Sequence, residues 1–265
     1  MQADQSQLQT SEPIRLDVRT ASLADVKAAL RAGLRDLGKR PALSIFFGLI
    51  YALFGATLIL GLANFEQIWI LVSVAVGFPL VAPFLAAGLY EMSRRHSRNE
   101  PYTASDIFLV IFNQQRRQFG WMSFLVLFIF WIWAYQVRLV LALTLHYSSF
   151  RSIDHFFDSL FTTGEGATFL LLGSLVGAVL ATILFTLTVI AMPLLLDKNV
   201  DVVTAMITSV KTVLQSPMVM LGWGAAIGAL TLLAIAPLFL GVIILFPILG
   251  HTSWHLYARL ISEEQ

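Results

Sequence analysis

The sequence predicts an all-α integral membrane protein with six transmembrane helices. Three observations lead to this prediction: an apolar composition, six long apolar segments and a one-sided distribution of positive charge. Hydrophobic residues make up 57% of the 265 residues and charged residues 12%, whereas a soluble domain carries roughly 25% charged residues. A chain this apolar has too little polar surface to cover itself in water, so we expect a lipid bilayer around it.

Six apolar segments are long enough to cross about 30 Å of hydrocarbon as helices. They are residues 43–63, 67–90, 119–143, 168–196, 217–236 and 238–258. The last two form one long apolar run, and we predict the turn between them at Ala236-Pro237. Residues 1–20 are polar and do not resemble a signal peptide. We therefore expect a disordered N-terminal tail, followed by a single transmembrane domain over residues 21–260.

The basic residues predict the orientation. Of the 17 Lys and Arg residues, all except Arg138 and Arg151 lie before the first segment, after the last, or in the second and fourth connections. Positive charge stays on the cytoplasmic side, so both termini should be cytoplasmic. The net charge of +1 gives no reason to expect a nucleic acid partner. With no cysteine in the sequence, disulfides and thiolate chemistry are excluded.

Three segments with a shared pattern each precede a pair of spans. The first, DVKAALRAGLRDLGKRP, runs from Asp25 to Pro41, and the second, DVVTAMITSVKTVLQSP, runs from Asp201 to Pro217. A less similar copy, DIFLVIFNQQRRQFGWM, begins at Asp106. Ten residues after each aspartate stands a basic residue: Arg35, Arg116 and Lys211. Fixed spacing of this kind indicates internal repeats.

The repeats predict three units, residues 22–91, 104–198 and 200–260. Each unit would contain a cytoplasmic amphipathic helix followed by a transmembrane hairpin. The returning span of each hairpin contains proline in its inner half: Pro79, Pro83, Pro193 and Pro247.

The helix that opens the first unit is predicted to lie in the membrane interface. Ser22 and Asp25 resemble a capping box at its start, and Gly38 and Pro41 end it. One face is apolar, with Leu23, Val26, Leu30, Leu34 and Leu37. The helix either directs insertion and packing or binds anionic lipid through its basic face. The predicted lipid-interface residues are Lys27, Arg31, Arg35, Arg116 and Lys211.

His251 and His255 are the candidate cofactor-binding residues. Their i, i+4 spacing puts both imidazoles on one helix face, where they could share a metal or ligate haem. A third ligand would have to come from the second connection, where the candidates are Glu91, His96 and Glu100. Alternatively, both histidines join Trp254 and Tyr257 in an interfacial belt. We expect no resident cofactor.

Other polar and small residues allow structural and functional interpretations. The polar residues of the long outer connection belong either to an interfacial helix that ends at a turn with Gly164 and Gly166, or to a site for a divalent cation or a partner; they are Asp154, His155, Asp158 and Glu165. Arg138, near the outer end of the third predicted span, could form a structural ion pair or have a functional role. Two small-residue pairs permit close helix packing within the bundle or between copies: Gly173 with Gly177, and Gly224 with Gly228.

Four sequence blocks resemble a known family. They are LRAGLRDLGKRPALSIFFGLIYALFG, FPLVAPFLAAGLYEMSRRHSRNEP, PLLLDKNVDVVTAMITSVKTVLQSP and LGHTSWHLYARL, in that order from about residue 25 to 260. They resemble the bacterial family of predicted integral membrane proteins named domain of unknown function 2189. The resemblance implies a bacterial inner-membrane protein, and it implies no catalytic residues.

Three functional hypotheses follow. The favoured one is a non-catalytic scaffold, assembly factor or accessory subunit of a larger inner-membrane complex, with membrane lipids as further partners. The second is a transporter or channel for a small apolar or weakly polar solute, with a cavity near the prolines of the returning spans. The third is a metal or haem protein using His251 and His255. Because the span centres contain no acid or lysine, proton coupling is disfavoured, and no hydrolase or kinase signature is visible.

Overall fold

A computed structural model describes residues 16–63, 68–114, 118–145 and 153–263. The described residues are mainly helical, with one small antiparallel sheet. In chain order the elements are β1 Leu16–Val18, α1 Leu23–Lys39, α2 Pro41–Ala63, α3 Ile68–Arg98, α4 Ala104–Gln114, α5 Phe119–Thr144, α6 Ile153–Thr162, α7 Gly164–Thr188, α8 Ala191–Asp197, α9 Val202–Gln215, α10 Pro217–Ile235, α11 Val242–Leu260 and β2 Ile261–Glu263.

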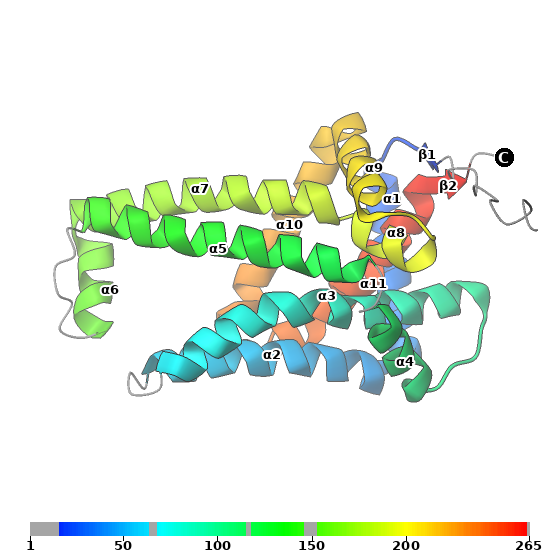
Figure 1. The fold of residues 1–265 in the computed structure, drawn as a ribbon, viewed down its shortest axis with the longest axis horizontal. Helices are drawn as coiled ribbons and strands as arrows, with labels where there is room; N and C mark the ends of the chain where they lie inside the picture. Colours follow the sequence, from blue (N-terminus) through cyan, green and yellow to red (C-terminus); the bar gives the residue numbers. More distant parts are fainter. Residues whose placement is uncertain (1–15, 64–67, 115–117, 146–152, 264–265) are drawn as a thin grey trace, which may run out of the picture.

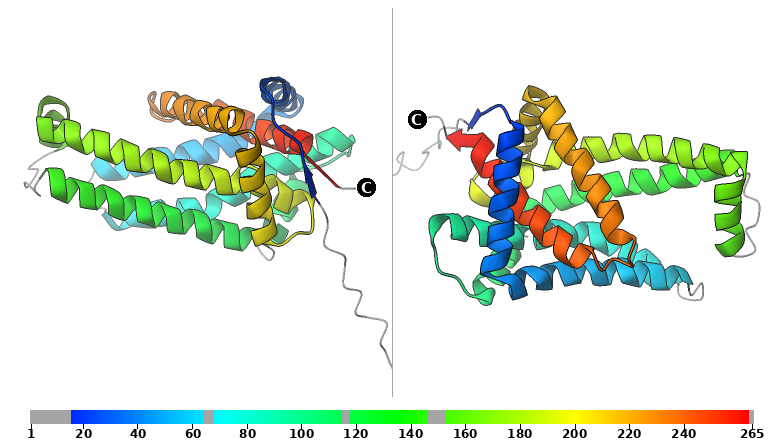
Figure 2. Two further views of the ribbon diagram at one scale, coloured as in Figure 1. Left: turned by 90° about the horizontal axis from the view of Figure 1, so that it is seen from above. Right: turned by 180° about the vertical axis from the view of Figure 1, so that it is seen from behind.

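The long helices run roughly along the long axis of the molecule (Figure 1). Helices α2 and α3 lie side by side, as do α5 and α7, and α10 and α11 cross these pairs obliquely. The short helices α1, α4, α8 and α9 gather with the sheet at one end, whereas α6 lies at the other (Figures 1 and 2). All three helices that were predicted to lie in the interface are therefore at the same end.

Three helical stretches of the described chain are long and apolar enough to cross a membrane. They are Phe119–Thr144, Gly164–Asp197 and Pro217–Ile235, and α1 with the first part of α2 forms a fourth candidate, bent by 105°. The chain is thus a multi-pass integral membrane protein with three or four candidate spans in the part that the structure describes. Helices α3 and α11 overlap the second and sixth predicted segments, but α3 extends beyond residue 90 and α11 begins only at Val242.

The corner between α1 and α2 forms where the sequence predicted it. Ser22 and Asp25 make a reciprocal capping box at the start of α1, which satisfies two backbone donors at the helix end. Arg40 leaves the helical conformation with φ −139° and ψ 63°, and Pro41 begins α2. Proline suits the first helical position because its missing N–H has no partner there.

The turn between α10 and α11 also confirms the prediction from sequence. It follows Ala236-Pro237 and contains two non-glycine residues with positive φ, Leu238 at 53° and Phe239 at 66°. A Cβ on Gly241 would come within 2.7 Å of the backbone of Ala234. The absence of a side chain at Gly241 therefore lets the chain return directly against α10.

The two ends of the described chain pair with each other. Strands β1 and β2 are antiparallel, and Asp17 lies opposite Ser262. This arrangement corrects the predicted disordered tail, because Leu16–Val18 is ordered by backbone pairing to the end of the chain; residues 1–15 lie outside the described residues. Paired strands must be on the same side of a membrane, as predicted for the two termini.

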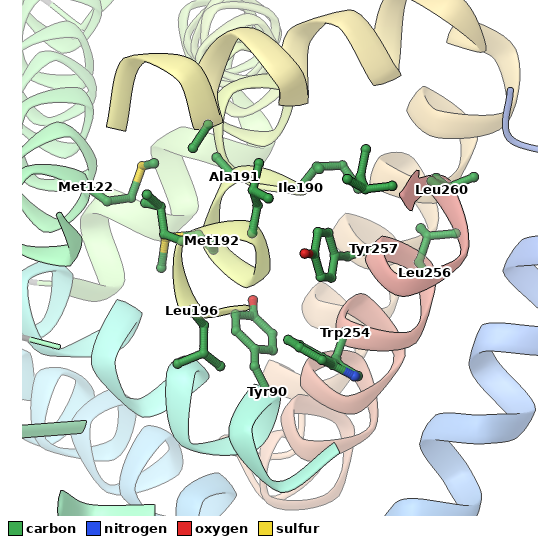
Figure 3. Packing of buried hydrophobic residues seen from close by; sticks show 14 of the residues in the cluster. Tyr90, Met122, Ile190, Ala191, Met192, Leu196, Trp254, Leu256, Tyr257 and Leu260 are labelled. Carbon is green, nitrogen blue, oxygen red and sulfur yellow. The ribbon is translucent and has the colours of Figure 1, made fainter. Parts of the chain in front are cut away.

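The largest hydrophobic core lies at the end where the short helices meet the long ones. It surrounds α8, whose Ala191, Pro193 and Leu194 are buried together with the neighbouring Ile190. Figure 3 shows Tyr257 and other α11 side chains facing this short helix. A second cluster joins α2, α3, α4 and the α10–α11 turn. This packed end positions the polar residues that form the candidate site.

Candidate functional site

Helix α1 has a third face that the apolar-versus-basic pattern did not indicate. Its buried residues are small or acidic: Asp25, Ala29, Ala32, Gly33 and Asp36. By contrast Leu23 and Leu34, from the predicted apolar face, are 65% and 47% exposed. These two leucines are therefore free to contact lipid, whereas Val26, Leu30 and Leu37 of the same face are half-buried. A separate face of α1 packs on the protein. Small residues one turn apart, at Ala29 and Ala32–Gly33, were the signal available in the sequence.

This small-residue face lets α1 lie directly on α11. A Cβ built on Gly33 would be 2.6 Å from Oγ1 and 2.8 Å from the backbone nitrogen of Thr252. Such distances are shorter than normal van der Waals contact, so no side chain fits at Gly33 without moving one helix. The close approach brings Asp36, one turn further on, against the C-terminal end of α11.

Asp36 is the centre of a buried polar cluster. Its Oδ2 lies 2.6 Å from Nε2 of His255. Its Oδ1 lies 3.2 Å from Nδ1 of His96 and 3.3 Å from Nζ of Lys39. Burial alone raises the pKa of the Asp36 carboxyl, but hydrogen bonds from His255 and Ser93, and the charges of His255 and His96, outweigh it and lower the pKa to about 2.

His251 occupies a different environment from His255. Its Nε2 lies 3.0 Å from Oγ of Ser44 in α2, and its Nδ1 lies 2.7 Å from Oγ of Ser93 in α3. Both ring nitrogens are engaged in this way, and the ring is fully buried. The two histidines thus face different partners, rather than one shared ion. Within the described ranges, no group of three or more His, Asp or Glu residues is placed to hold a metal.

The three candidates for a third ligand are separated by the fold. His96 reaches the cluster, and its Nε2 lies 2.8 Å from the hydroxyl of Tyr102. Glu91 is buried but points elsewhere, forming ion pairs of 2.7 and 2.6 Å with Arg94 and Arg95. Glu100 is exposed in the α3–α4 connection. Only His96 among these is brought near His255.

The interfacial-belt interpretation of the α11 aromatics is wrong. Trp254 and Tyr257 are 3% and 2% exposed because α1 and α8 both contact α11. The Tyr257 hydroxyl donates a 2.9 Å hydrogen bond to Asp197, which also pairs with Arg98 at 2.8 Å. These residues therefore join α11 to α8 and α3 inside the protein, away from lipid headgroups.

A small cavity opens beside the carboxylate of Asp36, and we refer to it as the Asp36 pocket. Its volume is about 160 Å³. Helices α1, α3 and α11 supply its lining: Ala32, Arg35, Asp36, Lys39, His96, Ser97 and His255. Arg35, which was predicted only as a lipid-interface residue, thus shares a pocket with the histidine cluster. The other residues of that prediction are elsewhere.

Lys27 and Arg31 are exposed on α1, outside the Asp36 pocket. Lys211 borders an apolar groove of about 570 Å³ between α7 and α9. Arg116 lies outside the described residues. Of the predicted lipid-interface residues that the structure describes, Arg35 alone therefore lines the Asp36 pocket.

The other sequence candidates do not form a common site. Asp158 and Glu165 are exposed near the α6–α7 junction, and the side chains of Asp154 and His155 lie outside the described residues. Arg138 is exposed on α5.

The glycine pairs behave unequally. A Cβ on Gly224 would be 3.2 Å from the ring of Phe185, and one on Gly177 would be 3.6 Å from Trp133. Nothing lies within 4 Å of the corresponding positions at Gly173 and Gly228. Each pair therefore places one glycine against a side chain and leaves the other open.

Comparison with known proteins supports the membrane assignment. A family model described as "Predicted integral membrane protein (DUF2189)" matches residues 70–197. No curated protein and no solved structure matches the chain. The matched range includes the block FPLVAPFLAAGLYEMSRRHSRNEP and ends before the Gly250–His255 segment.

Proposed function

We propose that this chain, whose residues 70–197 match the DUF2189 family of predicted integral membrane proteins, is a non-catalytic accessory or scaffold subunit of a larger membrane complex. The observation that carries the proposal is that few residues of the candidate membrane spans are buried by the rest of the chain. In the most apolar window of α5 only 11% of residues are buried, and in that of α10 only 17%. Such helices offer most of their circumference to lipid or to another protein.

One face of α5 favours a protein partner over lipid alone. Its residues recur every three or four positions, as along a packing seam: Trp121, Phe124, Phe128, Trp131, Tyr135 and Leu139. They are 48% to 66% exposed, and several line a shallow groove of about 510 Å³. Helices associate in membranes through close packing rather than hydrophobic burial, and a groove of rigid aromatic side chains provides such a packing surface.

We further propose six spans with both termini in the cytoplasm of a bacterium, arranged as three units. Support comes from the corners that open the first and third units. Arg40 and Ser216 share nearly the same backbone conformation, φ −139° with ψ 63° and φ −142° with ψ 57°, and each is followed by a proline that starts a long helix. The second unit opens like the first, since Thr103 and Asp106 exchange cap hydrogen bonds.

The alternative of a solute path near the prolines has less support. Pro193 and Pro247 are both buried. Ile190 to Leu196 pack with α11 in the main hydrophobic core, where a transporter of this design would need an open cavity. The described residues around Pro193 leave no room there for a solute.

The proposal is tested by crosslinking in intact membranes at native expression. A photoreactive phenylalanine analogue is placed at Phe128 or Tyr135 on the α5 face and, as the control, at Leu53 on α2, which is 57% exposed. We expect an adduct of one discrete mass from both α5 positions and not from Leu53. Mild solubilisation should recover the same adduct partner without crosslinking. A chain that migrates alone, with equal diffuse adducts from all three positions, would contradict the proposal.

A further inference from the structure

We propose that the Asp36 pocket binds a small phosphate-bearing anion on the cytoplasmic side of the membrane. The inference rests on the charges that line the pocket, on its position relative to the spans and on its size. It does not depend on the protein being a subunit of a complex.

The lining combines several cationic or hydrogen-bonding groups with one acid. Arg35 and Lys39 are cations one helical turn apart on α1, and His96 and His255 add two imidazoles. The carboxylate of Asp36 already interacts with His255, His96 and Lys39. Its negative charge is therefore compensated within the cluster, and it adds little repulsion toward a bound anion.

Arg35 is the lining cation best placed to receive a ligand. It makes no ion pair with an acid among the described residues, and its side chain is exposed to solvent. A guanidinium presents a planar fork of donors that matches two oxygens of a phosphate. Lys39 supplies a second, flexible positive charge from the next turn.

The position of the pocket indicates the side from which a ligand enters. His96 and Ser97, which line it with Arg35, lie near the C-terminal end of α3. This end extends beyond the long helices on the side where the short helices and the strands β1 and β2 gather (Figure 1). The leucines of α1 occupy a different face of the helix from Arg35 and Lys39. The pocket consequently opens away from the spans, on the side of the paired strands β1 and β2.

The volume indicates which part of a ligand the pocket can hold. A cavity of about 160 Å³ that opens to solvent accommodates a phosphate group, and the remaining atoms of a larger ligand would extend out of it. The phosphate could belong to a free phosphomonoester or to the headgroup of an anionic phospholipid.

The test uses the full chain in nanodiscs of two compositions. In phosphatidylcholine discs, inorganic phosphate and glycerol phosphate are added and binding is followed by isothermal titration and by the melting temperature. In discs containing phosphatidylglycerol, no soluble phosphate is added and the melting temperature is compared with that in phosphatidylcholine. Arg35→Gln and Lys39→Gln are compared with Arg31→Gln, an exposed cation on the same helix that does not line the pocket.

We expect wild type and Arg31→Gln to bind alike, and Arg35→Gln and Lys39→Gln to bind about tenfold more weakly or worse, because each removes a charge-assisted contact. Arg35→Lys should be intermediate, because it keeps the charge and loses the fork. A response to soluble phosphate identifies a free anion as the ligand source, and a response only to phosphatidylglycerol identifies a headgroup. If neither probe binds, or if Arg31→Gln weakens binding as much as Arg35→Gln, the proposal is overturned.

Discussion

Nε2 of His255 lies 2.6 Å from Oδ2 of Asp36, although 219 positions separate the two residues in the chain. Asp36 is near the end of the first helix, and His255 is near the end of the last one. The contact therefore joins the first and last helices at the end of the bundle where the short helices gather. It also explains how an acidic residue is accommodated on the buried face of α1.

Asp36→Asn should destabilise the protein by about 1.5–3 kcal/mol, because it removes the charge from hydrogen bonds that are shielded from water. The free energy of unfolding in mixed detergent micelles measures this effect. His255→Gln should cost a similar amount. The double variant should lose less than the sum of the two, since both changes remove the same interaction.

Lys27→Gln is the control for the Asp36 variants, because Lys27 is exposed on the same helix. A change within about 0.5 kcal/mol is expected there. Equal stability losses in Asp36→Asn and Lys27→Gln would show that the Asp36 cluster does not hold α1 in place.

Two glycines in α1 should respond in opposite directions to alanine. Gly33→Ala places a Cβ 2.6 Å from Oγ1 of Thr252, and relieving this contact by moving α1 from α11 should cost about 1–3 kcal/mol. Gly38→Ala meets nothing within 4 Å and should stabilise by up to about 1 kcal/mol through helix propensity. Melting temperatures of both variants under one detergent condition check the prediction. Parallel shifts would contradict the close α1–α11 contact.

A disulfide should form between the two terminal strands. The sequence contains no cysteine, so Asp17→Cys with Ser262→Cys would supply the only thiols. Directly opposed residues in antiparallel strands have Cα atoms about 4.5–5.5 Å apart, within the range of a disulfide. Mild oxidation of intact membranes should give a fast-migrating, reducible monomer.

Each single-cysteine variant serves as the control for this experiment and should show no reducible change in the monomer. Full thiol reactivity of both positions after oxidation of the double variant would contradict the pairing of β1 with β2.

Acid should release α1 through protonation of Asp36. The pKa of this carboxyl falls from its ordinary value of 3.8 to about 2 in the folded protein. Its contribution to stability is thus fully present above about pH 4 and is lost as the pH falls toward 2. The shift corresponds to about 2 kcal/mol. Melting temperatures measured from pH 5 to pH 2 should fall more steeply in wild type than in Asp36→Asn.

A second loss of stability, at a higher pH than that caused by Asp36, is expected from His96. Burial lowers the pKa of His96 below its ordinary value of 6.5, against the opposing influence of Asp36. Its contribution to stability is therefore present above about pH 6.5 and declines as the pH falls below that value. His96→Gln should remove this part and leave a fall in melting temperature below pH 4. A profile that is the same in wild type and both variants would contradict the assignment.

The sequence allowed the membrane environment, the limits of several spans and the helix corners to be predicted. Helix α5 covers residues 119–144 and α10 covers residues 217–235, within one residue of the predicted segments. The corner at Pro41 and the turn after Ala236 also follow the prediction. These features depend on composition over one helix length or on one residue's backbone preference, so each is specified locally.

The tertiary structure alone decided which face of α1 is buried and which residues meet at its end. In the sequence Asp36 is an ordinary acid on an amphipathic helix, and His251 and His255 are a pair that could share a ligand or join an interfacial belt. Their real partners are determined by how α11 crosses α1, α2 and α3, and that crossing depends on Gly33 and on surfaces brought together from opposite ends of the chain. Contacts over such separations arise from packing geometry, which no local pattern specifies.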